Sequence, residues 1–345
     1  MLFSYSLIAH DIEKLQTFLE HTVLKVWCAA DSTIPFSIDL LDQDYRVLYE
    51  KRYKLHKDIE KIYNLFVPLS TTQKEFIRDT FNSNNRIEGL CCNDIEPIFY
   101  KDIIREVSQD LSDTLKDFNN YLYKFLDKSD AAFVKHYTSA TIYYKELVSQ
   151  LPASRCPFCG IERIKSKRIS RRDAYDHYIP KSLLPFTAIN VKNLAPMCKD
   201  CNESWKSDNN PIMTNKDSGD NRKTFYPFCN DLPEIGIYFD NLYLDPLDED
   251  EHNIEIRYEC EEYEVEVSTW RSIFYIDERY DDLIRTDCKV WLEEVRMLGD
   301  RKTDDTLAKT EYIQKKQENK FIESNFLTIP FLLACDEMGL LNKVT

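Results

Sequence analysis

Apolar residues in the N-terminal part of the chain recur at the spacing of amphipathic helices. The clearest case runs from Asp94 to Leu126, and its apolar positions lie three or four residues apart, at Ile103, Val107, Leu111, Leu115, Phe118, Leu122 and Phe125. This spacing is typical of a helix with one buried face. A second helix is expected from Asp44 to Phe66, and a third from an N-cap at Ser129 to Leu151. The pattern predicts a helical domain over residues 1–151.

The periodicity changes in the C-terminal third of the chain. The stretches "GIYFDNLYLDP" and "IEIRYECEEYEVEVS" alternate with period two, which is typical of half-buried strands. Helical spacing returns from Trp270 onward, including "RYDDLIRTDCKVWLEEVRML" and "IPFLLACDEMGLL". We therefore predict a mostly helical α+β fold with a small β-hairpin or sheet in an α+β region, residues 226–345, that packs on the central segment or binds a partner.

Composition excludes several classes of protein. The chain has 345 residues, 43% of them hydrophobic, and no apolar run near the roughly 18 residues that a membrane span needs. The first residues lack the basic start of a secretory signal, so a cytoplasmic location is expected. Six glycines, none of them clustered, argue against a P-loop or dinucleotide-binding loop.

Charge is distributed unevenly along the chain. The net charge of −15 argues against non-specific coating of nucleic acid, because such binding needs concentrated Lys and Arg. Residues 154–206, however, contain eleven Lys or Arg and only five Asp or Glu. Positive charge is therefore concentrated in one central segment.

That segment also contains two Cys-x-x-Cys pairs, Cys156 with Cys159 and Cys198 with Cys201. Four thiolates in two such pairs suit a tetrahedral zinc ion, although coincidental spacing is the alternative. Gly160 can take the left-handed conformation that turns the backbone toward the sulfurs. A zinc ion bound by four sulfurs has no open position, so it would be structural. Between the pairs, "AYDHYI" and "VKNLAP" predict two short strands, and "KDCNESWKSD" predicts a helix starting near Lys199.

The order Asp176-His177, Asn193-Leu194 and Cys201-Asn202 resembles the zinc-stapled HNH endonucleases of the ββα-metal superfamily. The resemblance covers residues 154–208, about a sixth of the chain, within an expected module of residues 152–225. It implies a nuclease that uses Mg²⁺ or Mn²⁺ on DNA, with RNA as an open alternative.

The resemblance also implies a role for each matched residue. His177 would be the general base that takes a proton from water. Asp176 and Asn202 would bind the catalytic metal through oxygen, and Asn193 would fix the His177 loop by a hydrogen bond. Each residue also has an alternative role that involves no catalysis. Asp176 and His177 could be an ordinary hydrogen-bonded pair at the surface, Asn193 could end a strand, and Asn202 could cap a helix turn.

Five basic residues are candidates for contact with phosphates: Arg168, Arg171, Arg172, Lys181 and Lys206. The run that holds the three arginines also fits a solvated hairpin. Lys206 follows Asn202 by four residues, whereas the family often has a lysine at three, but both spacings reach the same face of a helix.

More loosely, "DHYIPKSLLPF" and "NLAPMCKDCN" resemble HNH effectors of bacterial anti-phage systems, which often act with a separate ATPase. This implies a protein partner such as an ATPase, and a homo-oligomer is possible because one HNH module cuts one strand per encounter. The rival hypothesis is a zinc-stabilised binding or scaffold protein whose nuclease site is silent.

Overall fold

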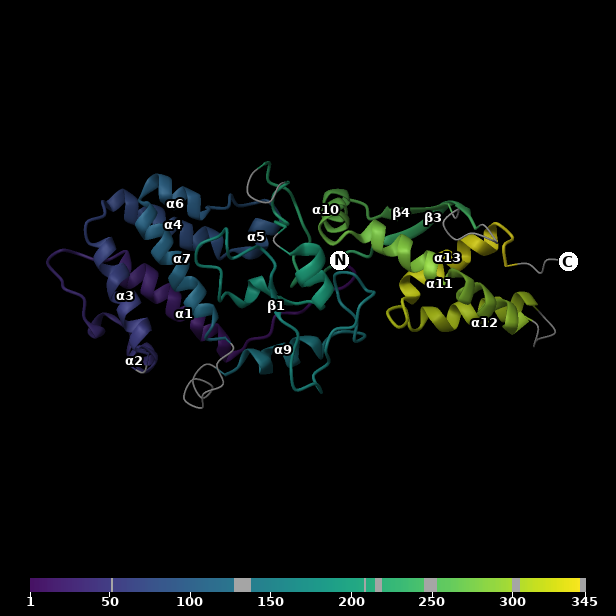
Figure 1. The fold of residues 1–345 in the computed structure, drawn as a ribbon, viewed down its shortest axis with the longest axis horizontal. Coiled ribbons are helices and arrows are strands. Elements are labelled where there is room, and N and C mark those ends of the chain that lie inside the picture. Colours follow the sequence, from purple (N-terminus) through teal and green to yellow (C-terminus); the bar gives the residue numbers. More distant parts are fainter. Residues whose placement is uncertain are drawn as a thin grey trace.

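The computed structural model describes residues 1–50, 52–126, 138–207, 209–214, 219–244, 253–299 and 305–341. Helices predominate, and the described strands form two small antiparallel sheets, which confirms the mostly helical α+β fold. In Figure 1 the N-terminal helices lie at one end of the molecule and the C-terminal helices at the other, with the central segment between them. None of the described helices is long and apolar enough to cross a membrane.

The N-terminal helices pack around a shared apolar core. The Trp27 ring lies 6.0 Å from Phe66 and 5.2 Å from Phe118, so helical segments distant in sequence meet at one indole. The elements are η1 (Asp11–Glu13), α1 (Lys14–His21), η2 (Thr22–Trp27), η3 (Ile38–Leu40), α2 (Gln43–Glu50), α3 (Tyr53–Phe66), α4 (Thr71–Asn84), α5 (Ile87–Cys91), α6 (Tyr100–Glu106), α7 (Gln109–Tyr123) and α9 (Ala140–Val148).

Helix boundaries differ from the expected ones in two places. The stretch from Asp94 to Leu126 contains two helices, α6 and α7, because the Ser108 side chain accepts a hydrogen bond from Leu111 N (3.2 Å) and starts a new helix. The stretch from Asp44 to Phe66 likewise contains α2 and α3. The third expected helix is present as α9, capped by Ser139, whereas the expected N-cap at Ser129 lies outside the described residues.

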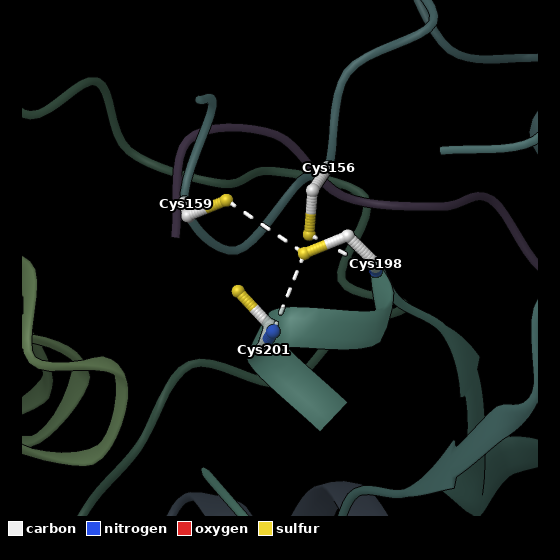
Figure 2. A group of neighbouring side chains, drawn as sticks. All are labelled: Cys156, Cys159, Cys198 and Cys201. Carbon is white, nitrogen blue, oxygen red and sulfur yellow. Dashed lines mark hydrogen bonds between the residues drawn. The ribbon is translucent and has the colours of Figure 1, made fainter. Parts of the chain in front are cut away.

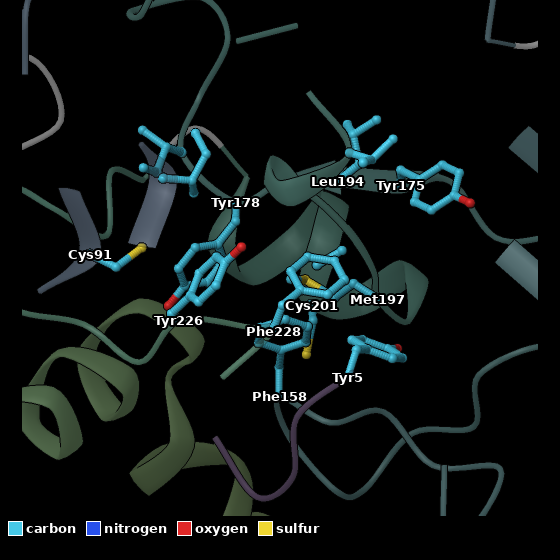
Figure 3. Packing of buried hydrophobic residues seen from close by; sticks show 14 of the residues in the cluster. Tyr5, Cys91, Phe158, Tyr175, Tyr178, Leu194, Met197, Cys201, Tyr226 and Phe228 are labelled. Atoms are coloured by element: carbon cyan, nitrogen blue, oxygen red, sulfur yellow. The ribbon is translucent and has the colours of Figure 1, made fainter. Parts of the chain in front are cut away.

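The central segment forms two strands followed by a short helix, as the sequence predicts. Strand β1 (Tyr175–His177) pairs antiparallel with β2 (Leu194–Pro196), with Asp176 opposite Ala195 and His177 opposite Leu194. The turn η4 (Val191–Asn193) leads into β2, and η5 (Asp200–Lys206), a short helix of π type, follows it. The first residues of the chain pack here, since Leu2 N donates to Pro157 O (2.8 Å) and the Tyr5 hydroxyl donates to Pro196 O (2.9 Å). Figure 3 shows Tyr5 in one apolar cluster with Phe158, Phe228 and Cys201.

In the described residues of the C-terminal part, a hairpin precedes four helices. These are β3 (Gly236–Tyr243), β4 (Asn253–Glu259), α10 (Glu264–Phe274), α11 (Ile276–Gly299), α12 (Asp305–Gln317) and α13 (Asn325–Glu337). The hairpin confirms the expected small sheet, but "EVEVS" begins helix α10 rather than continuing the strand. Val267, Trp270 and Phe274 explain this difference, because they are buried at the three- and four-residue spacing of a helix face.

Candidate functional site

The four cysteines of the two pairs converge on one point. They are all buried, and their sulfur atoms lie within 4.8 Å of one another, with 4.0 Å between Cys159 Sγ and Cys198 Sγ. A tetrahedral zinc ion with Zn–S bonds of about 2.3 Å separates its sulfur ligands by about 3.8 Å. Figure 2 shows the sulfurs facing a common centre. The cluster can therefore hold a metal ion such as zinc with all four positions filled by sulfur.

Backbone and side-chain donors surround these sulfurs. Cys201 N donates to Cys198 Sγ (3.3 Å), and Cys198 N lies 3.5 Å from Cys156 Sγ. A buried guanidinium from helix α11 completes the shell, because Arg279 Nη1 donates to Cys201 Sγ (3.2 Å). Its positive charge would offset the net negative charge of four thiolates around a bound zinc ion.

The turn after Cys159 has the backbone conformation expected from the sequence. Gly160 has φ +71°, and a Cβ added there would lie 2.4 Å from Leu2 Cδ1 and 2.7 Å from the Phe326 ring. A larger residue would be strained and would also clash with both neighbours. This glycine therefore lets the N-terminus and helix α13 pack directly on the cysteine turn.

His177, at the end of β1, is held in one tautomer. Its Nε2 lies 2.9 Å from Ala188 O, and because a carbonyl only accepts, Nε2 carries the proton. Burial, reinforced by the nearby positive charges of Lys181 and Lys206, lowers the pKa of His177 to about 3, although the bond to Ala188 acts in the opposite direction. The ring is therefore neutral near pH 7, and Nδ1 is its unprotonated nitrogen.

Asn193 fixes the chain just after His177. Its side chain is fully buried, and Oδ1 accepts from Ile179 N (2.8 Å) while Nδ2 donates to Ile179 O (2.9 Å). Tyr178 N also donates to Asn193 O (2.9 Å). The asparagine thus makes the hydrogen bonds to the His177 loop that the resemblance implies for it.

Asp176 points to a different neighbour. Lys206 Nζ, from the end of η5, lies 3.1 Å from Oδ1 and 3.0 Å from Oδ2, and it also donates to His177 O (3.2 Å). Both side chains are excluded from water, with 1% of Lys206 and 5% of Asp176 exposed. Burial raises the pKa of Asp176, and Lys206 opposes that rise. The sequence favoured phosphate contact for Lys206, whereas the structure buries its ammonium against Asp176.

The donors expected to bind a catalytic metal fit that role only in part. Asp176 Oδ2 is buried and accepts no hydrogen bond, so a cation could use it, but Lys206 already lies beside it. Asn202 is half-buried one turn before Lys206 on η5. The carboxylate and amide oxygens suit a hard cation such as Mg²⁺ or Mn²⁺, provided that it shares Asp176 with the ammonium or displaces it.

The remaining basic candidates fall into two groups. Arg168 and Arg171 are exposed in the chain before β1, and Arg172 lies over the Tyr175 ring, 4.6 Å from its centroid. Lys181 lies close to His177 instead. Its Nζ donates to Asn120 Oδ1 (2.9 Å) and sits 5.3 Å from the centroid of Tyr123, whose ring lies 4.5 Å from that of His177.

Several residues of the site could not be found by sequence reasoning. Arg279 is 78 positions from Cys201, and Asn120 and Tyr123 belong to helix α7 of the N-terminal part. None of them lies in a motif, so no local signal identifies them. Comparison with family models, curated proteins and solved structures gives no match for this chain.

Proposed function

We propose that the protein is a metal-dependent endonuclease of the HNH type that hydrolyses phosphodiester bonds, with DNA as the first substrate to test and RNA as the second. The observation that carries the proposal is the state of His177. Its Nε2 proton is committed to Ala188, its ring is neutral near pH 7, and Asn193 holds the loop that follows it. A general base must be unprotonated at the working pH, and the neutral His177 ring meets this condition. Because a pKa of about 3 makes the ring a weak base, the negative charge of a phosphate bound beside it would have to raise that pKa during catalysis.

In this proposal His177 Nδ1 accepts the proton of the attacking water. Asp176 and Asn202 would hold the divalent cation, which when bound neutralises charge on the phosphate and on the leaving oxygen. The bond from His177 to Ala188 places the proton of the neutral ring on Nε2, so Nδ1 is the nitrogen left to act, and Asn193 holds the backbone after the ring by hydrogen bonds. The cysteine cluster has no open position, so zinc would support this geometry without taking part in the reaction.

The expected location and partners belong to the same proposal. The large flanking regions would bind a protein partner or restrain the nuclease, within the cytoplasm and in defence against phage. These steps rest on the resemblance of the central segment alone.

A second candidate function is a zinc-stabilised binding or scaffold protein. The observation that favours it is the buried ion pair of Asp176 with Lys206, because an ion pair of this kind can be purely structural. The two candidates differ in what they require of His177. A scaffold does not need an imidazole at this position, whereas a nuclease does.

The test is nicking of supercoiled plasmid by purified protein with Mg²⁺, with Mn²⁺ or without added divalent ions, and total RNA is assayed in parallel. We expect metal-dependent nicking that falls about 10²- to 10⁴-fold in His177→Ala, the loss typical of a missing general base. The control is His56→Ala, which removes an imidazole from α3. Zinc content and melting temperature are measured for each variant.

Nicking by His177→Ala at the wild-type rate would contradict the proposed role of His177. Absence of metal-dependent cleavage of either substrate by the folded, zinc-loaded wild-type protein would favour the scaffold instead.

A further inference from the structure

The end of helix α7 forms one wall of the His177 site. Tyr123, the last residue of α7, lies against the His177 ring at a centroid distance of 4.5 Å. Lys181 lies over the same tyrosine and donates to Asn120, less than one turn earlier on α7. The N-terminal helical part therefore contacts the proposed catalytic residue directly.

Two further lysines flank this contact. Lys116 lies four residues before Asn120 and Lys124 four residues after it, so both are on the Asn120 side of α7, each about 6 Å away along the helix axis. Both side chains are exposed, and Lys181 between them is half-buried. The Lys181 ammonium bonds Asn120, and the Lys116 ammonium lies 5.7 Å from the centroid of the Tyr100 ring, so three positive charges lie along this side of the helix near His177.

This arrangement is electrostatically unfavourable in the free protein. Burial lowers the pKa of Lys181, and the positive charges of Lys116 and Lys124 lower it further. Asp117 shares this part of the helix, but the charges that act most on Lys181 are both positive. Lys124 at the helix C-terminus is favourable to the α7 dipole, but that explanation does not extend to Lys116 or Lys181.

An anion bound among the three lysines would relieve their mutual repulsion. The chain as a whole carries a net charge of −15, so a local group of three exposed or half-exposed lysines stands out from its surroundings. Local positive charge of this kind attracts the polyanionic backbone of nucleic acid. Its position next to His177 is where the phosphates that flank a scissile bond would lie.

We propose that Lys116, Lys124 and Lys181 form a phosphate-binding track that holds the substrate backbone next to His177. Helix α7 then supplies part of the substrate-binding surface, although it lies outside the central segment. This inference rests on the proposed nuclease function and adds a binding surface to it. The contacts are to phosphates, so the track would bind without sequence preference.

The test compares two double variants that remove the same charge. Lys116→Gln/Lys124→Gln removes the track lysines of α7, whereas Lys25→Gln/Lys315→Gln removes exposed lysines of η2 and α12. Binding of labelled single-stranded and duplex DNA is measured by fluorescence anisotropy over a range of salt concentrations. Both variants carry His177→Ala, so that the DNA is not cut.

We expect the track variant to bind duplex DNA about tenfold more weakly than its His177→Ala parent. The slope of log Kd against log salt concentration should fall by about 1.8, because two phosphate contacts are lost. The control variant should keep both the affinity and the slope. Lys116→Arg/Lys124→Arg should retain binding, because it preserves the charge.

In the cleavage assay with His177 intact, the track variant should raise KM and leave kcat nearly unchanged.

Equal affinity and slope in the track and control variants would overturn the inference. If the wild-type protein still nicked DNA and His177→Ala did not, the nuclease function would stand without the track. A wild-type protein that neither bound nor cut nucleic acid would overturn both proposals.

Discussion

The ammonium of Lys206 lies between the carboxylate of Asp176 and the carbonyl oxygen of His177, in a space closed to water. Removing two charges from water costs several kcal/mol per ion, and the attraction between them repays this cost only when both partners are present. The pair also ties the end of η5 to β1. Its integrity therefore controls the geometry of the two residues proposed to be catalytic.

Lys206→Met should lower the free energy of unfolding by about 3–5 kcal/mol, because it leaves Asp176 buried without its counter-ion. If Asp176 also binds a divalent cation, Mn²⁺ should raise the melting temperature of this variant more than that of the wild type, since the ion would replace the missing positive charge. Thermal and urea unfolding with and without Mn²⁺ measure both effects.

Lys192→Met is the matched control, because it removes an exposed lysine from the same segment and should change stability by less than about 0.5 kcal/mol. A stability of Lys206→Met equal to that of the control would show that the ion pair contributes little. A Mn²⁺ shift no larger than in the wild type would argue against a metal on Asp176.

For single residues, the sequence predicts which residue types form a site and how they are spaced, but it predicts less well which side chains contact one another. The cysteine cluster is predicted because the ligand spacing is local, and the bond between Asn193 and the His177 loop follows the expectation from the resemblance. The burial of Lys206 could not be predicted, because η5 winds as a π-type helix in which Ser207 N donates to Asn202 O (3.1 Å). That winding changes the direction of a side chain four residues after Asn202.

Helix α11 contacts the cysteine cluster through two consecutive residues, Arg279 and Tyr280. Arg279 donates to Cys201 Sγ and Phe274 O, and its guanidinium lies 5.3 Å from the Trp205 ring centroid. Tyr280, the next residue, donates its hydroxyl to Cys159 O (3.0 Å). The start of this helix therefore contacts both halves of the cysteine cluster.

Arg279→Leu should weaken zinc binding by about 10- to 100-fold, the usual effect of losing a partner of a metal ligand. The physical reason is that the negative charge of the tetrathiolate would lose its buried counter-ion. The measurement is the rate of zinc transfer to a chromogenic chelator. Arg279→Lys should release zinc more slowly than Arg279→Leu, because it keeps the charge although it loses the planar donor geometry.

The matched control is Arg285→Leu, because Arg285 also lies on α11 but pairs with Asp281 (2.7 Å) instead of a cysteine. Zinc release from Arg279→Leu as slow as from this control would mean that the guanidinium does not stabilise the bound metal.

For helices and strands, the sequence predicts which segments form them but is less accurate about where each one begins and ends. The strand, strand and helix of the central segment follow from alternation and motif spacing, both local signals. The break between α6 and α7 was missed because the apolar repeat continues through Val107 while Ser108 starts a new helix. The start of α10 was missed because Glu and Val alternate in its first turn, as in a strand. The helix forms because it buries Trp270.

Segments from three parts of the chain form hydrogen bonds to the turn from Pro157 to Gly160. Leu2 N donates to Pro157 O, Trp270 Nε1 donates to Phe158 O (2.6 Å), and the Tyr280 hydroxyl donates to Cys159 O. The first residues of the chain, the central segment and the C-terminal helices therefore meet at one half of the cysteine cluster. The sequence divides the chain at residues 151 and 225, but its periodicity carries no information about these contacts between distant segments.

If the cysteine cluster holds zinc, loss of the ion should loosen more than the central segment. Zinc binding contributes about 10–16 kcal/mol in zinc-finger peptides, which is as much as the whole stability of an ordinary domain, about 5–15 kcal/mol. In Cys198→Ser/Cys201→Ser we therefore expect faster hydrogen exchange not only in residues 154–206 but also at Leu2, α10 and the start of α11. Helix α3 should keep its protection, because Phe66 and Ile59 contact Trp27 within the N-terminal helices, where the Phe66 ring lies 6.0 Å from the indole and Ile59 O accepts from Trp27 Nε1. Cys335→Ser is the control, since it places a hydroxyl on a buried cysteine of α13 outside the cluster. Exchange mass spectrometry resolves these segments, and faster exchange confined to residues 154–206 would mean that the C-terminal helices hold their positions without the metal.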